Sequence, residues 1–231
     1  MVARKAGLVS IVVTSYNRRT YIQACLTSLI RQHYKNIEII VVDDASTDGT
    51  WQRIQGWRRQ LHNSDRHKVI TVRLPRNVGY SGALTSGMFL AGGEFIAIQD
   101  SDDLSRPTRI MKQVQYLRTH PNIAMVGTNY ALLRGSKIVA VPQSSVWLKF
   151  DPLAITRSYK QGKHCMCVGT LMIRGRLFDR FGGLTRRVRG AEDWELVDKL
   201  ISHGVRGNNL RDPLYIVRVH QSQRSHQFYR K

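Results

Sequence analysis

The sequence predicts an α/β fold built on a doubly wound, mostly parallel sheet with helices on both faces. Short continuous runs of apolar, β-branched residues alternate with longer stretches in which apolar residues recur at helical spacing. Continuous apolar runs are typical of parallel strands, because such strands are buried on both faces. Regular alternation of strand and helix favours right-handed β-α-β crossovers within one sheet.

The first strand and helix follow from the opening apolar pattern. Residues 8–13 form a continuous apolar run that predicts a strand. Residues 19–33 predict a helix because their apolar side chains fall on one helical face. These apolar positions are Tyr21, Ile22, Cys25, Leu26, Leu29 and Ile30. Together the two segments form the first strand–helix unit of the predicted sheet.

Three more strands and two more helices are predicted in the same alternating order. The strands are expected at 37–42, 69–74 and 94–98, and the helices at about 47–61 and 79–90.

The helix at 47–61 follows a turn sequence in which Thr47 or Asp48 is expected to be the N-cap. Beyond Pro142 the pattern loses its regularity, and we expect an irregular region with a few strands and helices there.

Length and composition favour one folded domain. The 231 residues suffice for one large α/β domain, and a hydrophobic content of 42% supports a sizeable core. Cys25, Cys165 and Cys167 form no disulfide framework and are typical of a reducing compartment. No apolar run approaches the roughly 20 residues that cross a bilayer. We expect a cytoplasmic protein without a transmembrane segment, with peripheral attachment to a membrane surface as an open alternative.

The charge balance favours an anionic partner. Lys and Arg total 36 against 16 Asp and Glu, a formal net charge of +20. The densest basic stretch is 134–189, where the acids are only Asp151 and Asp179. Such self-repulsion makes a nucleic acid, an acidic membrane surface or a charged glycan plausible as a partner. The alternative is a solvated basic surface that only keeps the chain soluble.

Acidic residues gather where two predicted strands end. Asp43 and Asp44 follow the second strand and Asp100, Asp102 and Asp103 follow the fourth, which accounts for five of the sixteen acids. Ligands of doubly wound sheets bind beyond the carboxyl ends of the strands. Close carboxylates repel unless a cation or shared proton relieves them, and oxygen ligands favour Mg²⁺ or Mn²⁺. Turn formation by Asp is the alternative for either cluster alone.

Four ordered motifs carry a family resemblance. They are SIVVTSYN at 10–17, VVDDASTDGT at 41–50, NVG at 77–79 and GEFIAIQDSDD at 93–103. In order and spacing they resemble the family 2 inverting glycosyltransferases, whose fold is called GT-A. A later motif, GAEDWEL at 190–196, resembles the late Glu-Asp motif of that family. The resemblance implies a GT-A fold and transfer of a sugar from a nucleotide diphosphate donor.

The resemblance also implies which residues bind the donor. Thr14 and Asp44, with Asp43 beside it, match positions that hold the nucleoside, and Arg76 or Asn77 matches one that contacts base or phosphate. The implied donor-binding set is Thr14, Tyr16, Asp43, Asp44, Arg76, Asn77, Asp100 and Ser101.

A metal site and a general base are implied in the same way. Asp102 and Asp103 match carboxylates that hold Mn²⁺ or Mg²⁺, and His220 resembles a late histidine that ligates the metal in some relatives. Asp193 matches the base that takes the proton of the acceptor hydroxyl. Two alternatives stay open: Asp193 as an acidic residue of a first helical turn, and His220 as a polar tail residue.

Two further features have an ordinary structural explanation. The tract His164-Cys165-Met166-Cys167 has poor spacing for a zinc site, and buried structural cysteines are the better interpretation. Trp147, Trp194 and Tyr159 could stack on an acceptor ring, although large aromatic side chains more often pack in the core.

Together these patterns predict a single GT-A domain over 1–231, with a nucleotide-sugar-binding half at 8–127 and an acceptor-side half at 128–231. The expected reaction moves one sugar from a UDP-sugar to a hydroxyl, on a polyanionic acceptor such as hydroxymethylated DNA, an acidic glycan or a glycolipid. A non-catalytic nucleic-acid-binding module and a nucleotidyltransferase are the alternatives. The latter usually needs a glycine-rich phosphate loop, and residues 14–19 contain no glycine.

Overall fold

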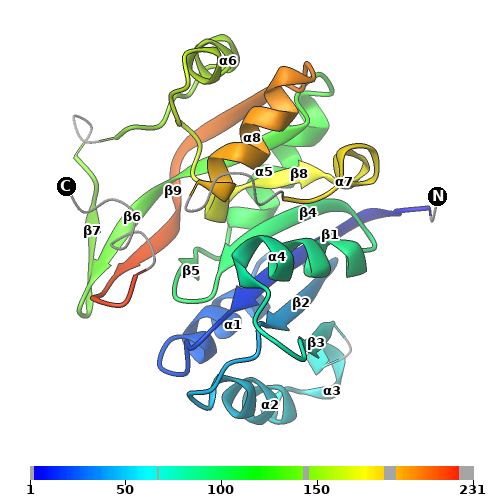
Figure 1. The fold of residues 1–231 in the computed structure, drawn as a ribbon, viewed down its shortest axis with the longest axis vertical. Helices are drawn as coiled ribbons and strands as arrows, with labels where there is room; N and C mark the ends of the chain where they lie inside the picture. The colour runs from blue at the N-terminus through cyan, green and yellow to red at the C-terminus, as the bar shows by residue number, and fades with distance from the viewer. Residues whose placement is uncertain (1–2, 67, 143–145, 185–190, 224–231) are drawn as a thin grey trace.

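The computed structural model describes residues 3–66, 68–142, 146–184 and 191–223 (Figure 1). Within these residues one nine-stranded sheet has the order β3-β2-β1-β4-β8-β6-β9-β5, with β7 paired to β6. The strands are β1 Lys5–Ser15, β2 Ile37–Asp43, β3 Val69–Arg73, β4 Gly93–Asp100, β5 Leu104–Ser105, β6 Met125–Arg134, β7 Lys137–Ala140, β8 Met172–Arg174 and β9 Gly207–Val219.

The sheet is parallel in its first half and mixed in its second. β3, β2, β1 and β4 run parallel to one another, as the continuous apolar runs predict. β8 is antiparallel to both β4 and β6, whereas β6 and β9 are parallel. The short strand β8 therefore joins the N-terminal parallel half to the C-terminal half in one continuous sheet.

Helices cover both faces of the sheet. They are α1 Ile22–Ile30, α2 Thr50–Gln60, α3 Asn63–Arg66, α4 Gly79–Leu90, α5 Arg109–Thr119, α6 Pro152–Lys160, α7 Gly175–Phe181 and α8 Glu192–Ser202, with a 3₁₀ turn, η2, at Val168–Thr170. One core cluster joins α1, α2 and α5 to the sheet, and a second joins α4, α6, α7 and α8 to its other face. Along β1, Ile11 and Val13 belong to the first cluster and Val12 to the second, which is the alternation of a strand buried on both faces.

The predicted doubly wound α/β fold is confirmed, and β1 to β4, α1, α2 and α4 lie where the apolar pattern places them. The N-cap prediction for α2 is wrong. Gly49 is the N-cap residue, in a left-handed conformation with φ 88°, and Asp48 stands one position earlier. From that position Asp48 Oδ1 accepts the amide of Thr50, the first residue of α2, at 2.9 Å. Asp48 therefore satisfies a backbone donor at the helix N-terminus without being the N-cap residue. Beyond Pro142 the chain forms α6 to α8, β8 and β9.

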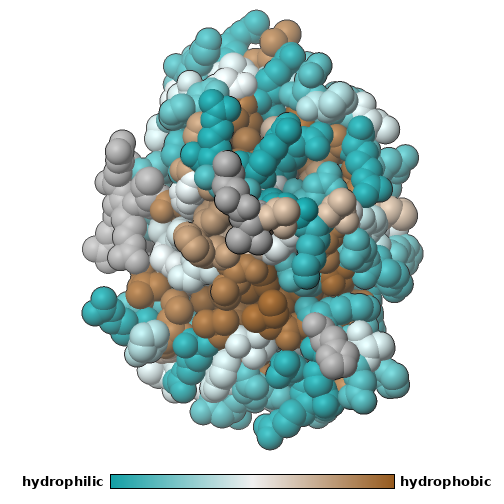
Figure 2. Space-filling view, turned by 90° about the vertical axis from the view of Figure 1, so that its right-hand side faces the viewer, coloured by the Kyte–Doolittle hydropathy of each residue, from teal (hydrophilic) through white to brown (hydrophobic). Residues whose placement is uncertain are grey.

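An apolar area marks one side of the molecule. Figure 2 shows it on the side to which the end of α4 and α7 face in Figure 1. Phe89 and Leu90 at the end of α4 are 80% and 47% exposed, and Phe89 meets Phe178 of α7 edge-on. Arg176 and Arg180, on the same helix as Phe178, are exposed. Among the described residues there is no helix with the length and apolar character needed to cross a membrane.

Helix α4 lies so close to the sheet that one of its glycines has no room for a side chain. A Cβ at Gly87 would overlap Cγ1 of Val12 and lie 3.1 Å from Cγ2 of Val42. Gly56 in α2 has open space around the same position. We expect Gly87→Ala to lower the free energy of unfolding by roughly 1–3 kcal/mol through overpacking. Gly56→Ala should raise it by about 0.5–1 kcal/mol, because alanine is the better helix former.

Urea unfolding of both variants beside the wild type checks this pair. Equal effects of the two substitutions would contradict the close packing of α4 on β1 and β2.

Candidate functional site

The carboxyl ends of three adjacent strands form the floor of the candidate site. Thr14 on β1 pairs with Val42 on β2 and with Asp100 on β4, and Ser15 pairs with Asp43. Thr14 and Asp43 are buried. Residues from three separate motifs therefore lie side by side at the edge where ligands of doubly wound sheets bind.

Asp43 is a buried acid with an unused acceptor. Its Oδ2 accepts the amide of Ser46 at 3.1 Å and lies 3.6 Å from Nε of Arg73. Its Oδ1 is buried and has no hydrogen-bond partner among the described residues. Burial raises the pKa of this carboxyl, against the opposing effects of Ser46 and Arg73. Buried polar atoms are normally satisfied, so Oδ1 is suited to accept a donor from a ligand.

Asp44 has a different position from its neighbour. Its two oxygens accept the amides of Val78 at 2.7 Å and Gly79 at 2.9 Å, at the start of α4. Asn77 adds to this loop by donating to the Asp44 carbonyl at 3.3 Å and accepting from the Gly79 amide at 3.2 Å. In this structure Asp44 and Asn77 thus hold the loop before α4, while the Arg76 side chain is exposed.

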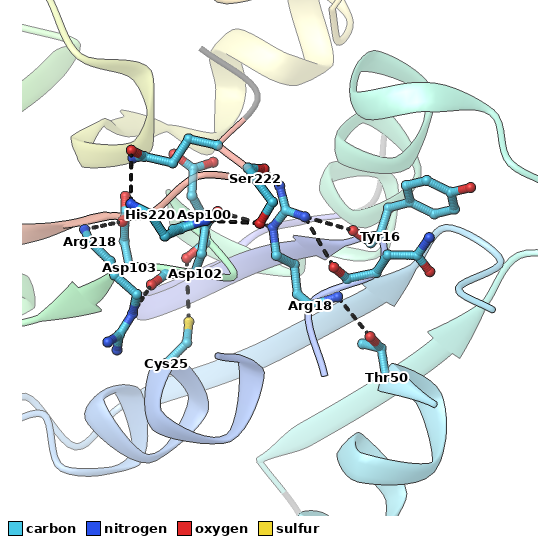
Figure 3. Close-up of polar contacts among 12 residues, drawn as sticks. Tyr16, Arg18, Cys25, Thr50, Asp100, Asp102, Asp103, Arg218, His220 and Ser222 are labelled. Carbon is cyan, nitrogen blue, oxygen red and sulfur yellow. Dashed lines mark hydrogen bonds and ion pairs between the residues drawn. The ribbon is translucent and has the colours of Figure 1, made fainter. Parts of the chain in front are cut away.

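Tyr16 lies at the margin of the site. It follows β1 and is 45% exposed, and Figure 3 shows its ring directed away from Asp102. Ser101 is buried beside Asp100.

The Asp100 backbone and side chain are closely confined. Its amide donates to the hydroxyl of Tyr215 on β9 at 3.1 Å, and its carbonyl accepts the Asp103 amide at 3.2 Å. A Cβ at Gly169 would overlap Asp100 Oδ2 and lie 2.8 Å from the Tyr215 hydroxyl. Only a glycine at this place in η2 allows the backbone to come so near the carboxylate.

Asp102 contacts both the guanidinium of Arg18 and the imidazole of His220 (Figure 3). Its Oδ2 lies 3.0 Å from Nε of Arg18 and 3.0 Å from Nε2 of His220. His220 is held on its other side by Ser222, 2.9 Å from Nδ1, and its ring lies 4.5 Å from that of Tyr21. With a side chain only 7% exposed, His220 is part of the site rather than a solvated tail residue.

Asp103 is turned into the protein. It is buried, and its Oδ1 accepts the Arg218 amide at 2.8 Å. Burial, followed by the charges of Asp102 and Asp100, holds its pKa well above the usual range for a carboxyl.

These residues fit a metal ion in part. Oδ2 of Asp102 and Nε2 of His220 converge, and a carboxylate oxygen with an imidazole nitrogen suits Mn²⁺. Asp103 Oδ1 is already engaged by the backbone of Arg218. The described residues contain no group of three or more acidic, histidine or cysteine side chains arranged for a metal. Two protein ligands are nevertheless usual for Mg²⁺ when substrate phosphates supply the others.

Asp193 approaches the acidic cluster from another element. It lies in the first turn of α8, where Oδ1 accepts the Trp194 amide at 2.9 Å and Oδ2 is 3.7 Å from Nε2 of His164. Burial acts to raise the pKa of Asp193, but His164 and the Trp194 amide outweigh it and leave that pKa lowered. The Cys167 thiol, whose pKa burial raises, is also affected by the charges of Asp100, Asp103 and Asp193. The turn η2, which follows Cys167, contacts both β4, which precedes the acidic cluster, and α8, which carries Asp193.

Sequence reasoning missed the residues that hold this site together. Arg18 and Arg218 are bonded to Asp102 and Asp103, yet no motif distinguishes them from the other arginines of a basic chain. Arg109 is fully buried on the face of α5 that also buries Gln113 and Leu117, and no motif distinguishes it from the other arginines. The three cysteines are free, as expected, with Cys25 and Cys165 buried.

Comparison with known proteins assigns the chain to a family. The model of the family described as "Glycosyl transferase family 2" matches residues 10–182, which include the strand-end acids described above. The chain belongs to this family.

Two relatives match nearly the whole chain. The putative glycosyltransferase EpsE of Bacillus subtilis is 34% identical over 91% of this chain and 72% of its own length. An Escherichia coli enzyme named UDP-Glc:alpha-D-GlcNAc-diphosphoundecaprenol beta-1,3-glucosyltransferase WfaP is 30% identical over 92% of this chain and 78% of its own.

Solved structures share the fold. TarS of S. aureus in complex with UDP-GlcNAc superposes with a TM-score of 0.74 at 22% identity, over 96% of this chain and 61% of TarS. The mannosyltransferase PcManGT of Pyrobaculum calidifontis, in complex with GDP-Man and Mn²⁺, gives a TM-score of 0.71 at 23% identity, over 95% of this chain and 59% of that one. The chain thus spans about 60% of the length of these structures and has the GT-A fold.

Proposed function

We propose that the chain is a metal-dependent inverting glycosyltransferase that moves one sugar from a UDP-sugar to a hydroxyl acceptor. The observation that carries this proposal is the presence of two separate acidic groups beside η2. A cluster suited to a nucleotide and a metal follows β4, the partly buried carboxylate of Asp193 lies in the first turn of α8, and η2 contacts both β4 and α8. Sugar transfer needs this division, because one group must stabilise the leaving diphosphate while another accepts a proton from the attacking hydroxyl.

The donor would bind at the ends of β1, β2 and β4. Asp43 Oδ1 offers the unpaired acceptor that an imide N–H of uracil requires, and Thr14, Asp100 and Ser101 line the same edge. The exposed Tyr16 and Arg76 are free to contact base or phosphate from the margin. Asp44 and Asn77, which match the family positions for nucleoside binding, would act by shaping the loop before α4. The UDP-GlcNAc complex of TarS supports a uridine donor.

The metal would be Mn²⁺ or Mg²⁺, held by Asp102 and His220 with donor phosphates as further ligands. When bound it supplies positive charge that stabilises the departing nucleoside diphosphate. Arg18 donates to the same carboxylate oxygen and orients it. Asp103 would not bind the metal itself; by accepting the Arg218 amide it would hold the loop after β4 that carries Asp102. PcManGT, which shares the fold, is described in complex with GDP-Man and Mn²⁺, and this supports a metal requirement.

Asp193 would act as the general base. Its lowered pKa keeps the carboxylate ionised at neutral pH and able to take the proton of the acceptor hydroxyl. That hydroxyl would attack the anomeric carbon in line with the departing diphosphate, so a single displacement inverts the configuration. Most of the benefit of so weak a base comes from its position.

The acceptor would be a sugar hydroxyl on a lipid-linked diphosphate. WfaP is named for an acceptor of that kind, and the diphosphate is an anion that suits the basic stretch 134–189. The apolar area around Phe89 and Leu90, with the exposed Arg176 and Arg180 of α7, is compatible with peripheral attachment to an acidic membrane. In this arrangement residues 8–127 bind the donor and 128–231 shape the acceptor side.

Membership of family 2 argues against the two other classes. A nucleotidyltransferase would transfer the nucleotide rather than the sugar.

Asp193→Asn should lower the rate of sugar transfer by about 10²–10⁴-fold, because the amide cannot accept the proton. Donor affinity should remain within a factor of about three, since Asp193 is outside the donor edge. UDP release and donor binding measured on the same preparations check both statements. Asp198→Asn, on the same helix, is the matched control and should behave as wild type. Transfer by Asp193→Asn at the wild-type rate would show that the base is a different residue.

Asp102→Ala should weaken Mn²⁺-dependent binding of UDP at least tenfold, as expected when one of two protein ligands of the metal is lost. EDTA should likewise abolish transfer by the wild type. Isothermal titration with and without Mn²⁺ provides the measurement. Asp65→Ala, which removes a half-buried ion pair with Lys68 away from the site, controls for loss of an acid. Unchanged Mn²⁺-dependent affinity in Asp102→Ala, with the fold intact, would rule out this metal site.

The acceptor class is checked by offering three acceptors with UDP-sugars and Mn²⁺. We expect transfer to GlcNAc-diphosphate-lipid to exceed transfer to free GlcNAc by at least tenfold, because the diphosphate adds ionic contacts to a basic surface. Hydroxymethylated DNA should not be glycosylated. Preference for that DNA, or equal use of free GlcNAc, would contradict the lipid-diphosphate assignment.

A further inference from the structure

A histidine outside the family motifs stands against the candidate base. His164 lies in the loop after α6, with Nδ1 2.6 Å from the hydroxyl of Tyr159 and Nε2 3.7 Å from Oδ2 of Asp193. Tyr159 comes from α6 and Asp193 from α8, so three segments of the acceptor-side half meet in one chain of polar groups. The Nε2 atom is buried and has no hydrogen-bond partner among the described residues, and the nearest acid is Asp193.

The imidazole is held in one orientation. The ring of Trp147 lies over it with centroids 5.1 Å apart and an interplanar angle of 31°. The ring of Tyr159 meets it edge-on at 5.8 Å. Trp147 is itself fixed, because its indole N–H donates to the Tyr130 hydroxyl at 3.0 Å. A flip of the ring would put Cδ2 in the place of Nδ1 and Cε1 in the place of Nε2, and would break the contact with Tyr159.

The Tyr159 contact also decides which nitrogen carries the proton. Burial raises the pKa of Tyr159 well above its usual value, so its hydroxyl stays protonated and donates to Nδ1. In a neutral imidazole the proton is then on Nε2, which faces the Asp193 carboxylate. Hydrogen bonds of catalytic groups are often long without substrate and shorten in the complex, so 3.7 Å is compatible with a working contact.

We propose that His164 is a positioning residue for Asp193, held by Tyr159 and Trp147 so that its Nε2 orients the carboxylate toward the acceptor hydroxyl. The inference rests on the proposed role of Asp193 as general base. His164 itself touches no reacting atom. In catalytic triads a nucleophile is activated by a base, and a third group orients that base. Here the nucleophile is the acceptor hydroxyl, the base is the Asp193 carboxylate and the orienting group is the His164 imidazole.

The pH profile separates this role from simple packing. Among the described residues, the titratable groups near Asp193 include His164, Tyr159 of α6, Cys167 before η2, and Glu192 and Glu195 of its own helix. Of these, His164 is the side chain that lowers the pKa of Asp193. Without it that pKa rises. A base works only when ionised, so the acidic limb of kcat/KM should move to higher pH.

The experiment compares His164→Ala, His164→Gln and Tyr159→Phe with the wild type in full pH–rate profiles on the intact chain. His164→Ala should lower kcat by about 10–100-fold with the KM for the donor unchanged, the cost of a misplaced catalytic group. Its acidic limb should move to higher pH. His164→Gln keeps an N–H near the position of Nε2 and should restore part of kcat. Tyr159→Phe should have a smaller effect in the same direction.

Two further variants make the outcome decisive. His203→Gln, at the opposite end of α8, should behave as wild type. In an Asp193→Asn background, His164→Ala should cause no further loss, because both substitutions disable one unit. An unshifted pH profile in His164→Ala, or an equal loss with and without Asp193, would overturn the inference and leave the proposed function standing. Full activity of Asp193→Asn alone would instead remove the proposed base and this inference together.

Discussion

The site depends on one buried guanidinium. Arg109 is fully buried, and it donates to the carbonyls of Ile98 at 2.8 Å and Gly169 at 3.1 Å and to the side chains of Gln99, Ser105 and Gln113. Its charge also lies 5.0 Å from the ring of Tyr215. Residues 99 and 105 bracket the acidic loop, so Arg109 fixes the loop at both ends. A buried charge is tolerated only when its hydrogen bonds are made, so these partners must keep their positions.

The second constraint is repulsion among the acids. Asp100, Asp102 and Asp103 lie within four residues of one another. Burial raises the pKa of Asp103 well above the usual range for a carboxyl, and the charges of Asp102 and Asp100 raise it further. Groups distant in sequence contact these acids: Arg18 after β1 and His220 after β9 lie against the Asp102 carboxylate, and the backbone amide of Arg218 donates to Asp103. The end of the last strand, β9, therefore supplies contacts to acids that follow β4. A chain of net charge +20 has ample cations, and the fold selects which of them reach the carboxylates.

The sequence predicts the elements of this fold better than the contacts within the site. Strands such as β1 and β2 are recognisable because burial on both faces leaves a continuous apolar run, and the acids at their ends follow from the strand boundaries. The motifs, through family resemblance, also pointed to His220 and Asp193. Side-chain partners could not be predicted, because they depend on sheet register and loop path. Asp44 meets Val78 and Gly79, and His164 meets Asp193, with no local pattern to connect them.

We propose that the strand-end acids and His220 form one site for a nucleotide and its metal. A crystal structure of the chain with UDP and Mn²⁺, with an anomalous map at the manganese edge, is the test of this site. We expect a manganese peak in contact with both Asp102 and His220, and uracil against Asp43. A peak elsewhere, or UDP in the 510 Å³ groove between α1 and α2 that Arg19 and Arg53 line, would contradict it.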